Sequence, residues 1–184
     1  MLELRIHGRG GQGVVTMAEL LAKAAVKTGL EAQTLPFFGV ERRGAAVKAC
    51  VRFDRTPIRI RSMSYHPQAI ALMNRNLLPY AQMDGIDPDT YFILNGKEPL
   101  DFKADQWLLD AEAVAIENNL VFGGEPFINV PMLGGIAKVL DIPLSAVEET
   151  IRGHWSGKKA DLNLAAVRQA YAQIKKFEGG RSHE

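Results

Sequence analysis

The sequence LELRIHGRGGQGVVTMAELLAKAAVKT at residues 2–28 passes from an alternating segment through a glycine cluster into a long apolar-rich segment. The alternation of apolar and charged residues predicts a strand, and the glycines predict a tight turn. In the apolar-rich segment, Glu19, Lys23 and Lys27 recur at four-residue spacing, which predicts a helix buried over most of its surface. A strand, a turn and a helix in this order indicate an α/β fold.

The glycine cluster Gly8-Arg-Gly-Gly-Gln-Gly13 fits the pattern G-x-G-x-x-G between a strand and a helix. In this setting bare backbone N–H groups and the helix dipole can hold a phosphate or a carboxylate. A site for NAD or FAD would also have an acidic residue at the end of the next strand, but residues 33–38 contain none. Alternatively, the glycines serve only the close packing of helix on strand.

A β-hairpin is expected next, with strands at 45–53 and 58–61. Its outer face would carry a row of basic side chains, namely Lys48, Arg52, Arg59 and Arg61. The preceding connection, Phe37 to Gly44, contains two aromatic residues and the trio Glu-Arg-Arg. Loop and hairpin together favour contact with phosphate groups or with an acidic protein surface. The alternative is a solvated basic face.

The remaining pattern predicts a mixed, mostly parallel sheet followed by three helices. Further strands are expected at 31–35, 69–73, 91–94 and 107–109, and a helix at 74–83. The C-terminal helices have predicted starts at Asn129, at the capping box Ser145 to Glu148, and at Asp161. Two glycines within 129–135 indicate a close approach to that helix backbone, and helix packing is favoured over a ligand.

The composition is that of an ordinary globular protein, with 47% apolar and 23% charged residues among 184. No apolar run reaches the roughly 18 residues of a membrane span, and the N-terminus lacks the pattern of a signal peptide, so the expected compartment is the cytoplasm. The single cysteine, Cys50, excludes a disulfide within the chain, and a thiolate-bound cluster would need cysteines from another chain.

Charge is divided unevenly along the chain. Residues 1–61 contain 11 Lys and Arg against 5 Asp and Glu, whereas the remainder contains 11 against 16. This excess of positive charge is a hint of an anionic ligand or partner near the N-terminal half. No histidines have metal-ligand spacing; His7 is expected to be solvated, and Lys158 and Lys159 are expected to face water.

These motifs together resemble the γ subunit, or γ domain, of the 2-oxoacid:ferredoxin oxidoreductases, the pyruvate:ferredoxin oxidoreductase family. The resemblance runs nearly end to end. It rests on four separated segments in the same order, which are Arg9-Gly-Gly-Gln-Gly13, Phe38-Gly-Val-Glu-Arg-Arg-Gly44, Asn129 with Met132-Leu-Gly134, and Asn163 with Ala166. The second segment looks more like pyruvate and branched-chain members than 2-oxoglutarate members.

The resemblance implies one three-layer α/β/α domain over residues 1–184, with a C-terminal helical segment. It implies a part in the oxidative decarboxylation of a 2-oxoacid to acyl-CoA and CO2, with ferredoxin as electron acceptor. Thiamine diphosphate, Mg²⁺ and [4Fe-4S] clusters would be held by partner subunits of the α, β and ferredoxin-like δ types. No catalytic or metal-binding residue is expected in this chain, and no membrane partner.

The residues expected to contact coenzyme A or the partner subunits come from the two loops. They are Gly8, Arg9, Gly10, Gly11, Gln12, Gly13, Glu41, Arg42, Arg43 and Gly44. Coenzyme A carries three phosphates, which suits a glycine loop and nearby arginines. Two rival hypotheses are a free-standing NAD- or FAD-dependent oxidoreductase and a basic β-ribbon that binds nucleic acid; the near-neutral net charge of +1 disfavours the second.

Overall fold

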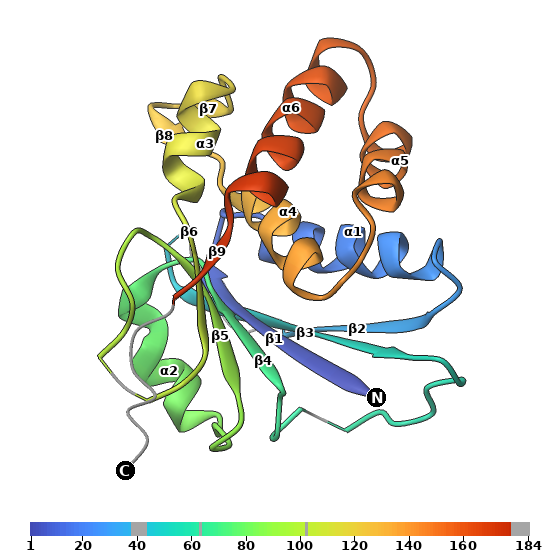
Figure 1. Ribbon diagram of the computed structural model, residues 1–184, viewed down its shortest axis with the longest axis vertical. Coiled ribbons are helices and arrows are strands. Elements are labelled where there is room, and N and C mark those ends of the chain that lie inside the picture. Colours follow the sequence, from blue (N-terminus) through green and yellow to red (C-terminus); the bar gives the residue numbers. More distant parts are fainter. Residues whose placement is uncertain (38–43, 63, 102, 178–184) are drawn as a thin grey trace.

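The computed structural model describes residues 1–37, 44–62, 64–101 and 103–177, and places a seven-stranded sheet between two helical layers (Figure 1). The strand order is β2-β3-β1-β4-β5-β6-β9. In chain order the elements are β1 Leu2–Arg9, α1 Val14–Val26, β2 Glu31–Phe37, β3 Ala46–Asp54, β4 Ala69–Leu72, the 3₁₀ helix η1 Arg75–Leu77, α2 Leu78–Met83, β5 Tyr91–Asn95, β6 Gln106–Leu109, α3 Ala111–Glu117, β7 Val121–Phe122, β8 Glu125–Pro126, α4 Asn129–Val139, α5 Leu144–His154, α6 Gly157–Gln173 and β9 Lys175–Lys176.

The α/β class and the mixed sheet are confirmed. Strands β1, β4, β5 and β6 pair in parallel, whereas β2, β3 and β9 make antiparallel pairs. Parallel pairing is therefore confined to the four strands at the centre of the sheet. No helix in the described ranges has the length and apolar character to cross a bilayer.

Each face of the sheet has its own apolar core. On the larger side, alternate sheet residues such as Leu4, Ile6 and Ile93 pack beneath α1, α4, α5 and α6. On the other side, Phe92 and Leu94 pack with α2. Central strands are buried on both faces, which explains their continuous apolar runs.

The predicted hairpin at 45–61 is wrong in its second half. Strand β3 forms, but it pairs with β1 on one side and β2 on the other, so no edge remains for residues 58–61. Arg52 is buried rather than displayed, with 1% of its surface exposed, and its guanidinium donates to the carbonyl oxygens of Ile60 and Ser62. The expected basic row therefore does not exist.

Strand β2 is longer than predicted, because it continues through Pro36 to Phe37. Pro36 pairs in register with Ala49 of β3, and β2 lies at the edge of the sheet. Proline lacks the backbone donor of an inner ladder but is tolerated on an edge strand. Pro36 therefore lies within β2 and does not end it.

The predicted starts of the C-terminal helices are displaced. Helix α4 begins at Asn129 itself, α5 begins one residue before Ser145, and α6 begins at Gly157, ahead of Asp161, and ends at Gln173. None of the three has a side-chain cap. Glu148, the supposed capping-box acid, instead pairs with Arg152 and Arg168. The capping patterns therefore predicted roughly where the three helices lie, but not the residues at which they begin.

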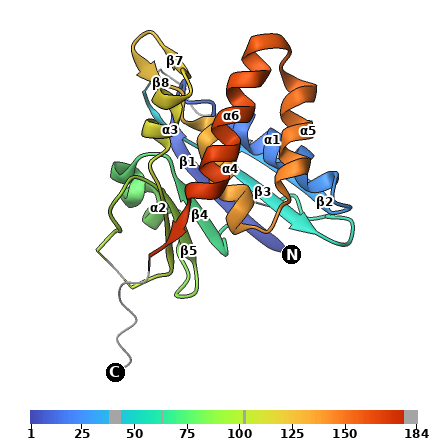
Figure 2. The same cartoon turned by 45° about the horizontal axis from the view of Figure 1, so that its top comes forward.

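Three elements were not predicted: α3, the β7–β8 hairpin and the short strand β9. Asp110 caps α3 by accepting from the N–H of Ala113 at 3.0 Å. The hairpin turns at Gly123 and Gly124, both with positive φ, a signal that sequence reasoning could have used. Figures 1 and 2 show the hairpin and the α5–α6 turn rising on the same side of the sheet.

Candidate functional site

The glycine loop joins β1 to α1 through backbone conformations that favour glycine. Gly11 and Gly13 have φ values of +92° and +74°. A Cβ on Gly13 would lie 2.6 Å from the Asn129 Nδ2 atom, and a Cβ on Gly8 would collide with the Val14 side chain. A side chain at Gly8 or Gly13 would therefore collide with a neighbouring side chain.

Hydrogen bonds fix the loop and connect it to the start of β3. The Gln12 Oε1 atom accepts from the N–H of Arg9 at 2.8 Å. Gly10 donates to the carbonyl of Ala45 at 2.8 Å, and Gly44 donates to that of Gly10 at 3.1 Å. The Arg9 guanidinium closes the connection by donating to the Gly44 carbonyl at 2.8 Å. The structure therefore brings the predicted residues Gly8–Gly13 and Gly44 together, while Glu41, Arg42 and Arg43 lie outside the described residues.

The N-terminus of α1 faces this loop without a neutralising group of its own. Its N-cap is Gly13, no side chain caps it, and its first turn contains no acidic residue. The first N–H groups of a helix have no partner within the helix, and they lie at the positive end of its dipole. Such an end binds phosphate or carboxylate groups.

A cavity of about 270 Å³ opens beside the loop, between Arg9, the glycines and the β7–β8 hairpin. Phe122 and Phe127 from this hairpin line the cavity, and their rings meet edge to face at a centroid distance of 6.2 Å. The Phe122 side chain is 75% exposed. Glu125 is the acidic residue of the lining. Sequence reasoning missed the hairpin residues, because it did not identify that element.

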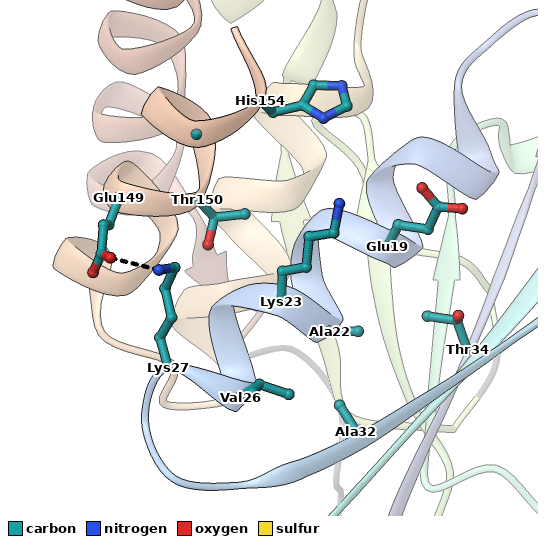
Figure 3. A pocket seen from close by; sticks show the side chains of 11 residues that line it. Glu19, Ala22, Lys23, Val26, Lys27, Ala32, Thr34, Glu149, Thr150 and His154 are labelled. Carbon is teal, nitrogen blue, oxygen red and sulfur yellow. Dashed lines mark hydrogen bonds and ion pairs between the residues drawn. The ribbon is translucent and has the colours of Figure 1, made fainter.

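A larger cavity, about 560 Å³, lies elsewhere, between α1, β2 and α5 (Figure 3). Lys27 and Glu149 form an ion pair of 2.5 Å between α1 and α5 at its side. The buried polar side chain of its wall, Thr150, is satisfied by the carbonyl of Ala146. The charged side chains around its apolar floor are exposed and can be solvated by water. The case for a ligand is therefore weaker in this cavity than at the glycine loop.

A buried polar cluster lies behind the loop on the α2 side of the sheet. The Arg5 side chain uses all five of its N–H donors, which bond His7 Nε2 and the carbonyls of Ser64, Ala81, Asp84 and Gly85. Arg5 therefore has no donor left for a ligand and acts as a structural anchor for the C-terminal end of α2. Lys48 is also occupied, because it pairs with Asp84 at 2.6 Å.

His7 is buried, with 3% of its surface exposed, so the prediction of a solvated histidine is wrong. Burial, followed by the nearby Arg5 charge, lowers the pKa of His7 to about 4. The ring is neutral at pH 7, and its Nε2 atom accepts from Arg5 Nε at 3.1 Å. A neutral buried imidazole bonded to an arginine indicates a structural residue.

Acidification is expected to destabilise the protein through His7. Because its pKa is lower in the folded state, the unfolded chain binds more protons between pH 6.5 and 4, and stability falls as the pH falls through that window. Urea unfolding at pH 7 and 4.5 should show that the wild type loses about 2–3 kcal/mol more than His7→Gln. Equal losses in the two proteins would contradict the assignment.

Comparison with known proteins identifies the family of this chain. Residues 3–173 match the family model described as pyruvate ferredoxin/flavodoxin oxidoreductase. The chain belongs to this family. Pyruvate synthase subunit PorC of Methanothermobacter thermautotrophicus is 38% identical over 96% of this chain and 98% of its own. The common γ subunit of the pyruvate/ketoisovalerate oxidoreductases of Pyrococcus furiosus is 37% identical, over 97% of this chain and 100% of its own.

Solved structures of the family share the fold. The pyruvate oxidoreductase subunit PORC of Thermotoga maritima superposes with a TM-score of 0.81 at 27% identity, covering 96% of this chain and 98% of that one. The 2-oxoglutarate:ferredoxin oxidoreductase of Magnetococcus marinus gives 0.78 at 20% identity over 93% of this chain and 30% of its own, a likeness of fold. The γ-type resemblance and the three-layer fold are thereby confirmed, and the chain is an oxidoreductase subunit of γ type.

The two rival hypotheses lose their basis. Strand β3 lies between β1 and β2 and is antiparallel to both, so the strand that follows α1 is not the parallel neighbour of β1 that carries the ribose acid in a dinucleotide site. The basic ribbon proposed for nucleic acid does not form, as described above.

Proposed function

We propose that this chain is the γ subunit of a complex that converts a 2-oxoacid and coenzyme A to acyl-CoA and CO2 while reducing ferredoxin. Pyruvate or a branched-chain 2-oxoacid is the proposed substrate, since the relatives cited above are named for pyruvate and ketoisovalerate. The chain acts within the complex, in the cytoplasm and as one domain, rather than alone.

Partner subunits of the α, β and δ types would hold the thiamine diphosphate, Mg²⁺ and [4Fe-4S] clusters. The donor set of this chain does not suit a cluster, because a cluster is usually held by four cysteines and the chain has one, Cys50, which is buried. Within the described residues, no three His, Cys, Asp or Glu side chains gather as metal ligands. No chemical step is therefore assigned to a metal on this chain.

The contribution of this chain would be to bind coenzyme A beside the partner's active site. The observation that carries this proposal is the uncapped, acid-free N-terminus of α1, which faces the glycine loop next to an open cavity. Its N–H groups would bond phosphate oxygens, while Arg9 holds the loop against Gly44. Arg42 and Arg43 follow one another immediately before Gly44 in the sequence and would add charged donors.

The proposed arginine contacts can be tested in the assembled complex. Arg42→Ala with Arg43→Ala should raise the KM for coenzyme A by about 10-fold or more, since bonds to charged groups contribute roughly 1.5–3 kcal/mol. The KM for the 2-oxoacid should stay unchanged. Arg59→Ala with Arg61→Ala is the matched control, because these exposed arginines lie beyond the opposite end of β3. An unchanged KM for coenzyme A in the first variant would refute these contacts.

Purification of the tagged chain from anaerobically grown native host tests the subunit assignment itself. Mass spectrometry should identify thiamine-binding and ferredoxin-like partners, and the preparation should be brown and reduce a dye when given a 2-oxoacid and coenzyme A. Recovery of a colourless chain alone, under conditions that preserve other complexes, would contradict the proposal.

A further inference from the structure

The outer edge of β2 has backbone groups that are free to pair with another strand. Strand β2 is the last strand on its side of the sheet and pairs with β3 in an unbroken antiparallel register. Pro36 has no N–H group to give to β3, and alternate residues of a strand point their backbone groups to the same side, so the N–H groups of Ala32 and Thr34 point away from β3. The carbonyl of His7, which bonds the N–H of Met73, sets the same alternation through β1 and β3.

This edge lacks most of the features that keep exposed strands from joining. A short length, a bulge or an outward lysine usually prevents two edges from pairing. Strand β2 has seven residues, no bulge and no lysine. Pro36 removes one donor near the end of the strand and leaves those of Ala32 and Thr34. The edge can therefore act as a template for strand addition.

Exposed apolar side chains flank the edge on both faces of the sheet. On the α1 face, Ala32 and Thr34 line the cavity of about 560 Å³ together with Val26, which is 54% exposed (Figure 3). On the opposite face, Ile60 is 46% exposed, and its carbonyl accepts from the same guanidinium as the Gln33 side chain. A chain that paired with β2 would cover apolar surface on both sides of the new ladder, which favours association.

The charges around the groove indicate what kind of chain fits there. The lining contains two acidic residues and two lysines, which are Glu19, Lys23, Lys27 and Glu149. Lys27 and Glu149 already pair with each other, whereas Glu19 and Lys23 are exposed and form no ion pair within the described residues. Because the two signs balance, the groove does not favour a strongly acidic or a strongly basic partner.

The order of these charges makes the surface complementary to itself. Helix α1 and β2 run in opposite directions, so Glu19 lies toward Thr34 and Lys23 lies toward Ala32 (Figure 3). A two-fold axis that pairs β2 with β2 of a second copy reverses this order. When Ala32 of one copy stands opposite Thr34 of the other, Glu19 of each copy faces Lys23 of its partner. Such an interface uses the same patch on both subunits.

We propose that two copies of this chain join through their β2 strands, antiparallel about a two-fold axis at Gln33, into one continuous sheet. Ala32 of each copy exchanges backbone hydrogen bonds with Thr34 of the other, and ion pairs between Glu19 and Lys23 flank this ladder. The groove shares no lining residue with the cavity beside the glycine loop, so that cavity stays open in the pair. A complex built on this contact contains its γ subunits in twos, whichever 2-oxoacid it uses.

An introduced cysteine tests the register of the pair. Gln33 lies on the proposed axis opposite its own copy, where the two Cα atoms of an antiparallel pair are about 4.5 Å apart and can be bridged by a disulfide. The full-length chain with Gln33→Cys should therefore form a linked pair on mild oxidation, seen on a non-reducing gel. The matched control is Gln173→Cys, at the exposed end of α6, and the natural Cys50 is buried. A link no stronger than that of the control would overturn the proposal.

Charge reversal tests the identity of the partner. Sedimentation of the wild-type chain at about 0.1 mM should show a dimer, and Lys23→Glu should raise its Kd by about 10-fold or more, because two acids then face each other at each pair. Glu19→Lys should have the same effect, and the two changes together should restore the dimer with the signs exchanged. Lys158→Glu is the matched control, since Lys158 is exposed on α6 and lies outside the groove. All three positions are exposed, so the variants are expected to fold.

Three results would overturn the proposal and leave the proposed function untouched. The first is a wild-type chain that stays monomeric at the concentration above. The second is a dimer that Lys23→Glu does not weaken, because that dimer would use another surface. The third is a Gln33→Cys link to a different subunit in the purified complex, which would assign the β2 edge to that subunit. The proposed function is tested separately, by the KM for coenzyme A of the variant at Arg42 and Arg43.

Discussion

Arg52→Met is expected to lower the free energy of unfolding by about 3–5 kcal/mol, the usual cost of removing one member of a buried ion pair. Arg52 is 1% exposed, and its Nε atom donates to Glu3 Oε1 at 2.6 Å. The substitution retains much of the apolar volume but leaves the Glu3 carboxylate buried, with Ser64 as its remaining side-chain donor. It also frees the carbonyls of Ile60 and Ser62.

Urea unfolding measures this loss, and a thermal melt should show a decrease in Tm of roughly 10 °C for a chain of this length. The matched control is Arg59→Ala, because Arg59 is exposed and makes no ion pair within the described residues, so its expected effect is within about 0.5 kcal/mol. A loss below about 1 kcal/mol for Arg52→Met would mean that the buried pair contributes little.

The burial of Arg52 could not be predicted from the sequence pattern. Along β3, Lys48 and Arg52 alternate with apolar residues and therefore read as a solvent-facing row. The pattern fixes which residues share a face, but it does not say what covers that face. Here Ile60, Ser62 and the end of α2 cover it, and Glu3 supplies the counter-charge from a neighbouring strand. Such long-range pairing has no local signature.

Elements with strong local signals were predicted well. The β1, glycine loop and α1 unit was found because alternation, glycines and helical spacing follow one another without interruption. The central strands were found from short apolar runs. The two-residue strands of the β7–β8 hairpin were missed, because two residues cannot show a period, and with them were missed the aromatic residues that line the cavity beside the glycine loop.

Part of the candidate site was predictable for the same reason. Gly8–Gly13 and Gly44 were named from the sequence, and backbone hydrogen bonds join them. Asn129 was named from the sequence as a helix start, whereas Asn163, 34 residues later, stood out only through the family resemblance. The helices that carry them, α4 and α6, pack side by side through small residues at the contact.

The contact between α4 and α6 is the basis of the second large loss of stability, which we expect for Gly134→Ala. A Cβ at position 134 of α4 would lie 2.6 Å from the carbonyl oxygen of Val167 and 3.2 Å from the Cβ of Ala170, both in α6. A backbone oxygen cannot rotate away as a flexible side chain can, so the two helices must separate. Overpacking of this kind costs about 3 kcal/mol, more than the roughly 1 kcal/mol that alanine gains over glycine in a helix.

Gly153→Ala in α5 is the matched control for that substitution. Gly153 is also helical, but nothing lies within 4 Å of an added Cβ, so this change should stabilise the protein by about 0.5–1 kcal/mol. Urea unfolding of the two variants should therefore shift the midpoint in opposite directions. A neutral or stabilising Gly134→Ala would show that α4 and α6 can separate at little cost, and that the place of Asn129 beside Asn163 is not fixed by this contact.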